Sequence, residues 1–219
     1  MPPVLRLYED VLSNGAEVTL PARPRMIFVA HGAIAMADHG PLRDDEAIGS
    51  ESAISLKSER EGATVWRFEL TSGDEDGTAA ASGVVSRERL SARLDTIPKG
   101  AVLLRGDSVA FPPGGRAYLH RHQGPGIRCL IDGGIRIDTK GHSTSYAPGG
   151  AWFESGPDPV FAQAAAGRPT RFIRTMILPM AYLARSSVEY LNEEDKPKPK
   201  TQTYKIYVDM PIDIVHSPA

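Results

Sequence analysis

Residues 114–134 read GGRAYLHRHQGPGIRCLIDGG. Two histidines, His120 and His122, stand two positions apart in a segment that is typical of a β-strand. Successive side chains of a strand point to opposite faces of the sheet, so residues two apart share a face. We therefore expect both imidazoles to face one cavity, which is how a barrel presents two nitrogen ligands to a metal ion.

Turn signals divide the surrounding sequence into short strands. A Gly-Pro-Gly turn follows the histidines, an apolar strand covers residues 127–131, and a second turn covers residues 132–134. The chain has 219 residues, of which 21 are glycine and 18 are proline, with only short apolar runs between them. This composition favours a mostly β fold with many tight turns.

These motifs resemble those of the cupin superfamily. The first cupin motif has a glycine, His-x-His, a glutamate four residues on, and an apolar strand that ends in glycine. The second motif opens with Pro-Gly-Asp. The matching positions are Gly114, His120, His122, Gly133, Pro148 and Gly149, while Gly150 stands where aspartate is usual. The resemblance is best over about residues 95–180, and it implies a double-sheet jelly-roll barrel.

The departures from the family pattern concern the metal ligands. The usual glutamate would fall at Gly126, the second-motif histidine near Pro159, and the asparagine at Gln163. Two of the four usual ligands are therefore missing, and two histidines alone make a weak site for a divalent ion. Either ligands from other positions complete the set, or the pocket works without a tightly held metal.

An internal repeat predicts a second barrel. Residues 25–32 resemble residues 126–133, and residues 62–70 resemble residues 171–178. We also align residues 18–21 with residues 109–112, so the first copy is shorter where the second carries His-x-His.

We interpret the chain as an all-β bicupin, with two tandem jelly-roll barrels and few short helices. Residues 1–85 form a degenerate N-terminal half, and residues 86–219 form the C-terminal barrel with the pocket and a C-terminal extension. Within this plan, residues 71–85 are a loop or linker, residues 86–95 form a short helix capped by Ser86, and residues 202–208 form a strand.

Two charged residues are candidates for catalysis. Arg128 faces inward if the alternation survives the Gly-Pro-Gly turn, and a buried arginine needs an anionic partner. That partner is either a protein carboxylate or a substrate carboxylate held bidentately. Glu154 is the acidic residue nearest to the missing ligands, so it is a candidate ligand or general base; its alternative is a solvated surface position.

Three further residues are candidates to bind the substrate. Tyr118 shares the parity of His120 and is a candidate for the pocket mouth, with core packing as its alternative. Trp152 shares a face with Glu154. Gln163 could offer a neutral oxygen to a metal or a hydrogen bond to the substrate.

Composition narrows the classes of partner. The formal net charge is −2, and no polybasic run or long apolar run is present, so we expect no nucleic-acid or membrane partner. The single cysteine, Cys129, excludes an internal disulfide. We expect a cytoplasmic protein, and the resemblance to cupins implies a homodimer.

Two functional hypotheses follow from this sequence. In the first, His120 and His122 hold a divalent Fe, Mn, Ni or Zn ion, completed by Glu154, Gln163 or water. The protein is then an oxidoreductase or isomerase that acts on a small anionic organic substrate. In the second, the C-terminal barrel is a metal-free module that binds or senses a small anionic ligand. Fold analogy alone does not choose between them.

Overall fold

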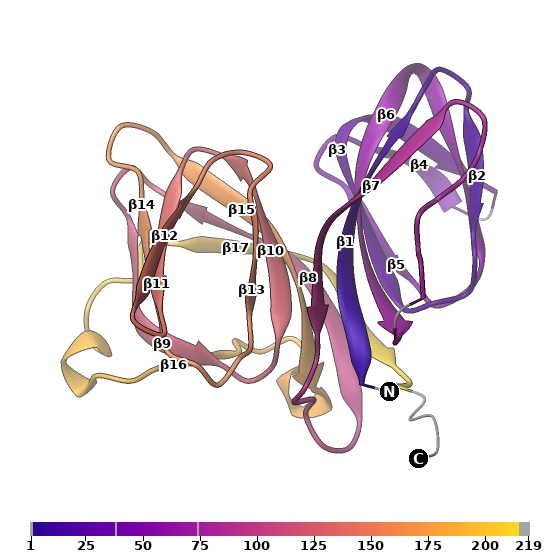
Figure 1. The fold of residues 1–219 in the computed structure, drawn as a ribbon. Coiled ribbons are helices and arrows are strands. Elements are labelled where there is room, and N and C mark those ends of the chain that lie inside the picture. Colours follow the sequence, from indigo (N-terminus) through magenta and orange to yellow (C-terminus); the bar gives the residue numbers. More distant parts are fainter. Residues whose placement is uncertain (1, 38, 74, 215–219) are drawn as a thin grey trace. The chain divides into compact units, whose positions relative to one another are not determined.

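The computed structural model describes residues 2–37, 39–73 and 75–214, and it is built almost entirely of β-strands (Figure 1). Its helical segments within these residues are two single turns of 3-10 helix, η1 (Met180–Tyr182) and η2 (Glu193–Asp195). The expected all-β fold with few short helices is confirmed. No helix in the described ranges is long and apolar enough to span a membrane.

The chain divides into two compact units between Asp95 and Thr96, and Ile214 belongs to the first unit. The first unit contains one sheet in the order β4-β3-β6-β1-β7, with β2 paired to β6 and β5 paired to β3. Its strands are β1 (Pro3–Leu12), β2 (Glu17–Leu20), β3 (Arg25–Met36), β4 (His39–Arg43), β5 (Ala47–Ser50), β6 (Ile54–Ser72) and β7 (Val84–Arg93).

Two long strands wrap the first sheet around an apolar interior. The β3–β6 pairing has register shifts beside His31 and Gly32, and irregularities of this kind bend the paired strands. The enclosed core takes residues from four strands; it includes Leu12, Val18, Leu20, Ile27, Val29, Leu56 and Val65.

The second unit consists of two five-stranded sheets that face each other (Figure 1). One has the order β13-β10-β15-β8-β17, from β8 (Val102–Phe111), β10 (Gly126–Asp132), β13 (Ala151–Glu154), β15 (Thr170–Pro179) and β17 (Thr203–Ile212). The other has the order β12-β11-β14-β9-β16, from β9 (Arg116–His122), β11 (Ile135–Thr139), β12 (His142–Tyr146), β14 (Val160–Ala164) and β16 (Val188–Tyr190).

The inner faces of these two sheets form one core. Phe111, Trp152 and Phe172 come from the first sheet, and Ile137 and Val160 come from the second. Side chains that alternate inward from two facing sheets are the basis of a jelly roll.

The two units repeat one topology. The order β3-β6-β1-β7 in the first unit corresponds to β10-β15-β8-β17 in the second. Gly32 and Gly133, which end the first aligned segment, both have φ of +85°. A Cβ on Gly32 would lie 2.3 Å from the Gly62 carbonyl oxygen, and one on Gly133 would lie 2.4 Å from that of Pro169. Both turns therefore require glycine for the same reason.

Two local expectations were wrong. Residues 86–95 contain no helix, because residues 84–93 form the strand β7, which pairs with β1. The first unit includes this strand and extends to Asp95, beyond residue 85. Residues 18–21 and 109–112 are not equivalent. Residues 18–20 lie in β2, whose counterpart in the second unit is β9, because these strands come directly before β3 and β10. Residues 109–111 lie in β8. The expected strand at residues 202–208 does form, as β17.

We predict that Gly133→Ala destabilises the fold by about 1–3 kcal/mol more than Gly141→Ala, measured by urea denaturation. Both glycines have positive φ, so both substitutions cost backbone strain. Only Gly133 packs against neighbouring backbone, whereas nothing lies within 4 Å of a Cβ on Gly141. Equal losses for the two variants would contradict the close packing at Gly133.

Candidate functional site

Polar side chains gather at one place in the interior of the second barrel. They surround a cavity of about 20 Å³, which we call the histidine cavity. Its polar lining consists of His120, His122, Arg128, Glu154, Arg174, Gln202 and Tyr204. Apart from Tyr204, these side chains are almost completely shielded from solvent. The cavity has room for about one water molecule or one ion.

Both histidines point into this cavity, as their spacing predicts. Their rings lie edge to face with centroids 4.9 Å apart. They come from the end of β9, where His120 lies opposite Val160 of β14. Val160 is one position beyond Pro159, so an apolar side chain faces His120 where the family would place its second-motif histidine.

The hydrogen bonds of His120 fix its tautomer. Its Nδ1 lies 2.7 Å from the carbonyl oxygen of Tyr118, which can only accept a hydrogen bond. Nδ1 therefore carries the proton, and Nε2 is a bare acceptor. Such a bond to a backbone carbonyl is also what orients metal-ligating histidines.

Burial keeps both imidazoles neutral. It lowers the pKa of His120 below the usual value of 6.5, although the Glu154 carboxylate acts in the opposite direction. Burial lowers the pKa of His122 further, and the positive charge of Arg128 adds to this effect. At neutral pH each ring therefore offers one unprotonated nitrogen.

Glu154, on β13, supplies a carboxylate to the site. It lies on β13 directly opposite Gly126 of β10, and cross-strand partners in an antiparallel pair share a face of the sheet. A Cβ on Gly126 would lie 2.4 Å from the Thr175 carbonyl oxygen, so no side chain fits there. The carboxylate missing from position 126 is thus provided by the neighbouring strand, and the solvated alternative for Glu154 was wrong.

Arg128 and Glu154 form a buried ion pair. The Arg128 side chain faces inward as expected, and its Nη2 lies 2.8 Å from Glu154 Oε2. Its Nη1 donates to the Gly126 carbonyl oxygen at 2.6 Å. Burial lowers the pKa of Arg128 to about 10, which leaves the guanidinium charged at neutral pH. Of the two alternatives for its partner, the structure shows the protein carboxylate.

Trp152 positions this carboxylate. Its indole nitrogen donates to Glu154 Oε1 at 2.8 Å. The indole ring stacks on Tyr146 with centroids 4.8 Å apart and meets Phe172 edge to face at 5.2 Å. Trp152 is therefore part of the core, where it holds Glu154 in place.

A second ion pair balances the charge of the site. Arg174 on β15 donates to Asp107 on β8 through Nε at 2.6 Å and Nη2 at 2.9 Å. Burial alone would lower the pKa of Arg174, but the attraction of Asp107 outweighs it and raises that pKa. The two arginines and two carboxylates therefore cancel in charge.

Two acceptor atoms in the histidine cavity lack hydrogen bonds. Among the buried side-chain nitrogens and oxygens of the described chain, only Glu154 Oε2 and Gln202 Oε1 make none. Glu154 Oε2 touches Arg128 without hydrogen-bond alignment and lies 3.4 Å from His122 Nε2. Gln202 uses its other end to donate to the Tyr190 hydroxyl at 3.0 Å. Unsatisfied buried acceptors are costly, so the cavity is suited to a donor or a cation.

Three predicted site residues, Tyr118, Trp152 and Gln163, lie outside the cavity lining. Between Ala117 and His120 the β9–β14 register shifts, so a bulge reverses the parity of Tyr118. The Tyr118 ring lies instead under the Lys198 ammonium, 5.1 Å from its centroid. Gln163 donates to the Gly114 carbonyl oxygen at 2.8 Å, and its neighbours Ala162 and Ala164 take the inward positions. Tyr118, Trp152 and Gln163 therefore do not line the histidine cavity, although we expected them in the pocket.

Sequence reasoning missed four residues at or beside the site: Asp107, Arg174, Gln202 and Tyr204. Asp107 and Arg174 lie in strands whose inward charges break an apolar pattern, which is the signal that could have found them. Gln202 belongs to the C-terminal extension, and no local pattern connects it with the histidines. Gln202 lies beside the histidines because the strand that follows it, β17, pairs with β8.

The first barrel has no counterpart of the two histidines. At the end of β2, where β9 carries His120 and His122, stand Val18 and Leu20, both buried. A fully paired ionic cluster remains in its interior, since Arg67 contacts Asp10 at 2.8 Å and Glu69 at 2.7 Å, and Arg25 contacts Glu69 at 2.8 Å.

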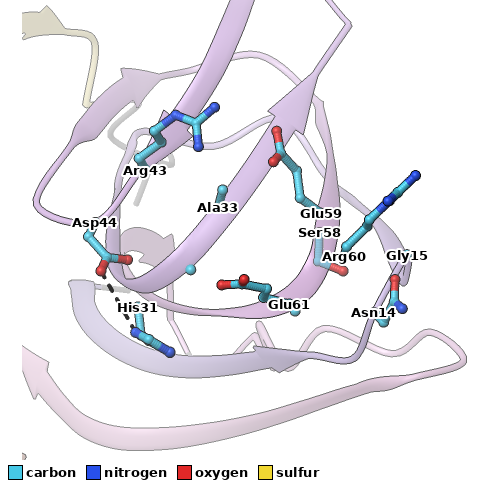
Figure 2. Close-up of a pocket in the computed structure, with 12 residues that line it drawn as sticks. Asn14, Gly15, His31, Ala33, Arg43, Asp44, Ser58, Glu59, Arg60 and Glu61 are labelled. Atoms are coloured by element: carbon cyan, nitrogen blue, oxygen red, sulfur yellow. Dashed lines mark ion pairs between the residues drawn. The ribbon is translucent and has the colours of Figure 1, made fainter.

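A wider hollow of about 790 Å³ lies on the first unit (Figure 2). His31 and Asp44 form a 3.8 Å ion pair at its rim, and their side chains are 76% and 63% exposed. Glu59, Arg60 and Glu61 also line this hollow and are exposed. Its charges are solvated, so it offers none of the desolvated chemistry of the histidine cavity.

Comparison with known structures shows the fold. Oxalate decarboxylase from Bacillus subtilis, in a single-residue mutant, matches with a TM-score of 0.64 and 13% identity over 90% of this chain and 74% of that chain. The chain has a tandem cupin fold. The same enzyme at pH 4.6 matches this bicupin with a TM-score of 0.61 and 11% identity, over 92% and 79% of the two chains.

A further structure of that enzyme, reported with its Mn(II) centres, matches with a TM-score of 0.63 and 12% identity over 90% and 74% of the two chains. No model of a protein family matches the sequence. No curated protein matches it either. At these identities the likeness concerns the bicupin fold, and the chemistry rests on the residues of the site.

We predict that Glu154→Gln lowers the free energy of unfolding by about 3–5 kcal/mol in urea, because Arg128 is left charged and buried without its carboxylate. Glu189→Gln is the control, since its pair with Arg121 is about half exposed and contributes about 0–1 kcal/mol. Adding Arg128→Met to Glu154→Gln should recover most of the loss. A loss no larger than that of the control would show that the buried pair is unimportant.

We also predict a pH dependence of stability from the two buried histidines. Their pKa values are lower in the folded chain than the usual 6.5, so the unfolded chain binds more protons between the two values. Stability is thus retained above pH 6.5 and lost as the pH falls below it, by up to about 1.4 kcal/mol per pH unit for each histidine.

The measurement is urea unfolding between pH 7.5 and pH 5 in the presence of a chelator. His120→Gln/His122→Gln should flatten the slope below pH 6.5. His31→Gln/His142→Gln removes two exposed histidines and should follow the unmodified protein. Identical slopes in all three proteins would contradict the neutral state of the buried pair.

Proposed function

We propose that the second barrel is the working half of a metal-dependent enzyme and that the histidine cavity holds one divalent ion. The observation that carries this proposal is the concentration of unsatisfied acceptors in a space of about 20 Å³. The lining contributes two neutral imidazoles, the Glu154 carboxylate oxygen that Arg128 contacts at 2.8 Å, and the Gln202 amide oxygen. A divalent first-row metal accepts this mixture of nitrogen and oxygen ligands.

Four residues would hold the ion: His120, His122, Glu154 and Gln202. Within the described ranges no three His, Cys, Asp or Glu side chains are arranged to hold a metal, so the two histidines and Glu154 would have to close around the ion, with the Gln202 amide oxygen as a fourth ligand. Of Fe, Mn, Ni and Zn we favour Mn, since the structurally similar oxalate decarboxylase has Mn(II) centres. A metal at this position would polarise a substrate oxygen as a Lewis acid.

The surrounding residues prepare the cavity for this chemistry. Burial holds both imidazoles unprotonated, and the Tyr118 carbonyl oxygen directs the lone pair of His120. Trp152 fixes one carboxylate oxygen of Glu154 and leaves the other toward the cavity. The enclosing core excludes bulk water, which strengthens every electrostatic interaction inside. The substrate we propose is a small organic anion.

One observation favours a second candidate function, a metal-free binding module. Arg128 already neutralises Glu154 at 2.8 Å, and a divalent ion at that oxygen would meet a fixed positive charge. In this case the positive charge of the Arg128 guanidinium replaces that of a metal ion, and the cavity holds a water molecule that donates hydrogen bonds to Glu154 and Gln202. The two candidates differ in metal content, so one measurement distinguishes them.

The deciding experiment is elemental analysis of the protein purified without chelator, combined with thermal unfolding in Mn²⁺, Fe²⁺, Ni²⁺ and Zn²⁺. We predict about one equivalent of metal per chain and a stabilising shift with the bound ion. His120→Ala/His122→Ala should lose both, because it removes the two nitrogen ligands. Glu154→Gln and Gln202→Leu should each lower metal content.

The matched control is His31→Ala/His142→Ala, which removes two exposed histidines and should keep full metal content. Circular dichroism establishes that each variant retains its β-structure. If the unmodified protein contains no stoichiometric metal and none of the four ions stabilises it, the metal proposal is rejected in favour of the metal-free module.

A further inference from the structure

The histidine cavity is covered least along one edge of the second barrel. Of the described residues that line it, Tyr204 alone is exposed, with 47% of its surface accessible to solvent. Val188 is partly buried, and the rest of the lining is buried. Val188 lies in β16 and Tyr204 lies in β17, which are the end strands of the two facing sheets. The thinnest cover over the cavity is therefore between these two edge strands.

One segment of the chain closes this edge. Residues 191–202, which we call the strap, leave β16 in one sheet and return to β17 in the other (Figure 1). The Tyr190 ring, just before the strap, lies 6.2 Å from the His120 ring. Gln202, the last residue of the strap, lines the cavity and donates to the Tyr190 hydroxyl at 3.0 Å. Both ends of the strap thus reach the site, and lifting it would uncover the cavity.

Polar groups rather than apolar packing attach the strap to the barrel. Within residues 191–202 only Asp195 and Gln202 are buried, and both are polar. The Leu191 amide donates to the Leu119 carbonyl oxygen at 3.0 Å, which extends the β16–β9 pairing by one residue. Segments with few buried apolar contacts open locally long before the fold is lost.

A single ammonium group fastens the strap. Lys200 Nζ donates to three backbone carbonyl oxygens of the strap, among them that of Lys198 at 2.8 Å. The same ammonium lies 4.2 Å from the ring centroid of Tyr190 on β16 and 5.2 Å from that of Tyr118 on β9. The carbonyl contacts fold the strap on itself, and the two rings hold it to the barrel.

These contacts depend on the positive charge of Lys200. Its neighbours Lys196 and Lys198 pair with carboxylates of the strap, whereas Lys200 has no carboxylate partner among the described residues. Its charge is met by carbonyl oxygens and by the faces of two aromatic rings, which attract a cation. A neutral side chain of similar length keeps hydrogen-bond donors but loses the attraction to the rings. The outward position of Tyr118 therefore supplies half of this aromatic contact.

We propose that the strap is a gate over the histidine cavity and that Lys200 is its latch. With the latch closed, His120 and His122 are shielded from solvent. When the strap lifts, Gln202 leaves with it, and an ion or a small molecule enters between β16 and β17. As a control on the site, this inference rests on the proposed function, but the motion itself requires no metal.

The experiment measures how fast the buried histidines become accessible to diethyl pyrocarbonate, which modifies imidazole nitrogens. Trypsin then releases His120 and His122 on separate peptides, because Arg121 lies between them. The full chain is treated in the presence of a chelator, and the exposed His142 on the same barrel is the internal reference. Relative to His142, we expect Lys200→Gln to raise the modification rate of both histidines by about tenfold, as for the loss of two cation–π contacts.

Two variants are matched controls. Lys200→Arg keeps the cation over the rings, so the rate should stay within about twofold of the unmodified protein. Lys196→Gln removes the same charge from the same strap, but Lys196 pairs with Glu193 at the surface, so the rate should again change by less than about twofold.

Amide hydrogen exchange on the same proteins separates opening of the strap from unfolding. Lys200→Gln should speed exchange in residues 188–202 and leave the central strands β8 and β15 unchanged. Tyr118→Leu removes one ring beneath the latch without changing any charge. It should raise the modification rate in the same direction as Lys200→Gln, by a smaller factor.

Three results would overturn the gate. One is a modification rate that neither Lys200→Gln nor Tyr118→Leu changes. Another is an equal increase in Lys196→Gln, which would make the effect one of general charge. The third is faster exchange of β8 and β15 in both latch variants, which would mean that the histidines react through unfolding. Elemental analysis tests the proposed function separately, since full metal content with an unchanged modification rate rejects the gate alone.

Discussion

The ion pair between Arg128 and Glu154 is the interaction on which the site of the second barrel depends. Both side chains are buried, and a charge in the interior of a protein is tolerated only with a partner. The pair accounts for the other arrangements around it: Gly126 leaves the space, Trp152 anchors the carboxylate, and the Arg174–Asp107 pair restores neutrality. The histidines remain unprotonated because they are buried beside positively charged arginines, which lowers the pKa of both.

The first barrel shows what the fold alone provides. It repeats the strand order of the second barrel and even keeps an arginine on the central strand, Arg67, paired with an aspartate on the neighbouring strand. Its equivalents of the histidines are apolar, and every charge in its ionic cluster has a partner. The same architecture therefore carries a closed, satisfied interior in one half and an interior with unsatisfied acceptors in the other. Function in this chain belongs to a few side chains, and the fold positions them.

The sequence predicts the fold and the centre of the site because both follow from local periodicity. The spacing of His120 and His122 and the inward parity of Arg128 depend only on alternation along a strand. The tandem repeat was visible because the glycine turns at Gly32 and Gly133 impose the same local sequence.

The errors arise where pairing overrides local pattern. One extra residue in β9 reverses Tyr118, and pairing with β1 makes residues 84–93 a strand despite a helical pattern. The pairing register of β13 with β10 places Glu154 opposite Gly126. The pairing of β17 with β8 brings Gln202 to the cavity from a distant part of the chain. Neither contact is visible in the residues adjacent in sequence. Register and chain return are properties of the assembled sheet, so they could not be predicted from a single sequence.

The position of β13 at the edge of its sheet has a kinetic consequence. This four-residue strand pairs with β10 alone, so its backbone amides are protected by one neighbour and should exchange with solvent by local opening before the barrel unfolds. Glu154 is carried on that strand. Opening of the edge withdraws the carboxylate from Arg128 while the histidines, on β9 between β14 and β16, stay in place. We therefore expect the complete site to open more often than the barrel unfolds.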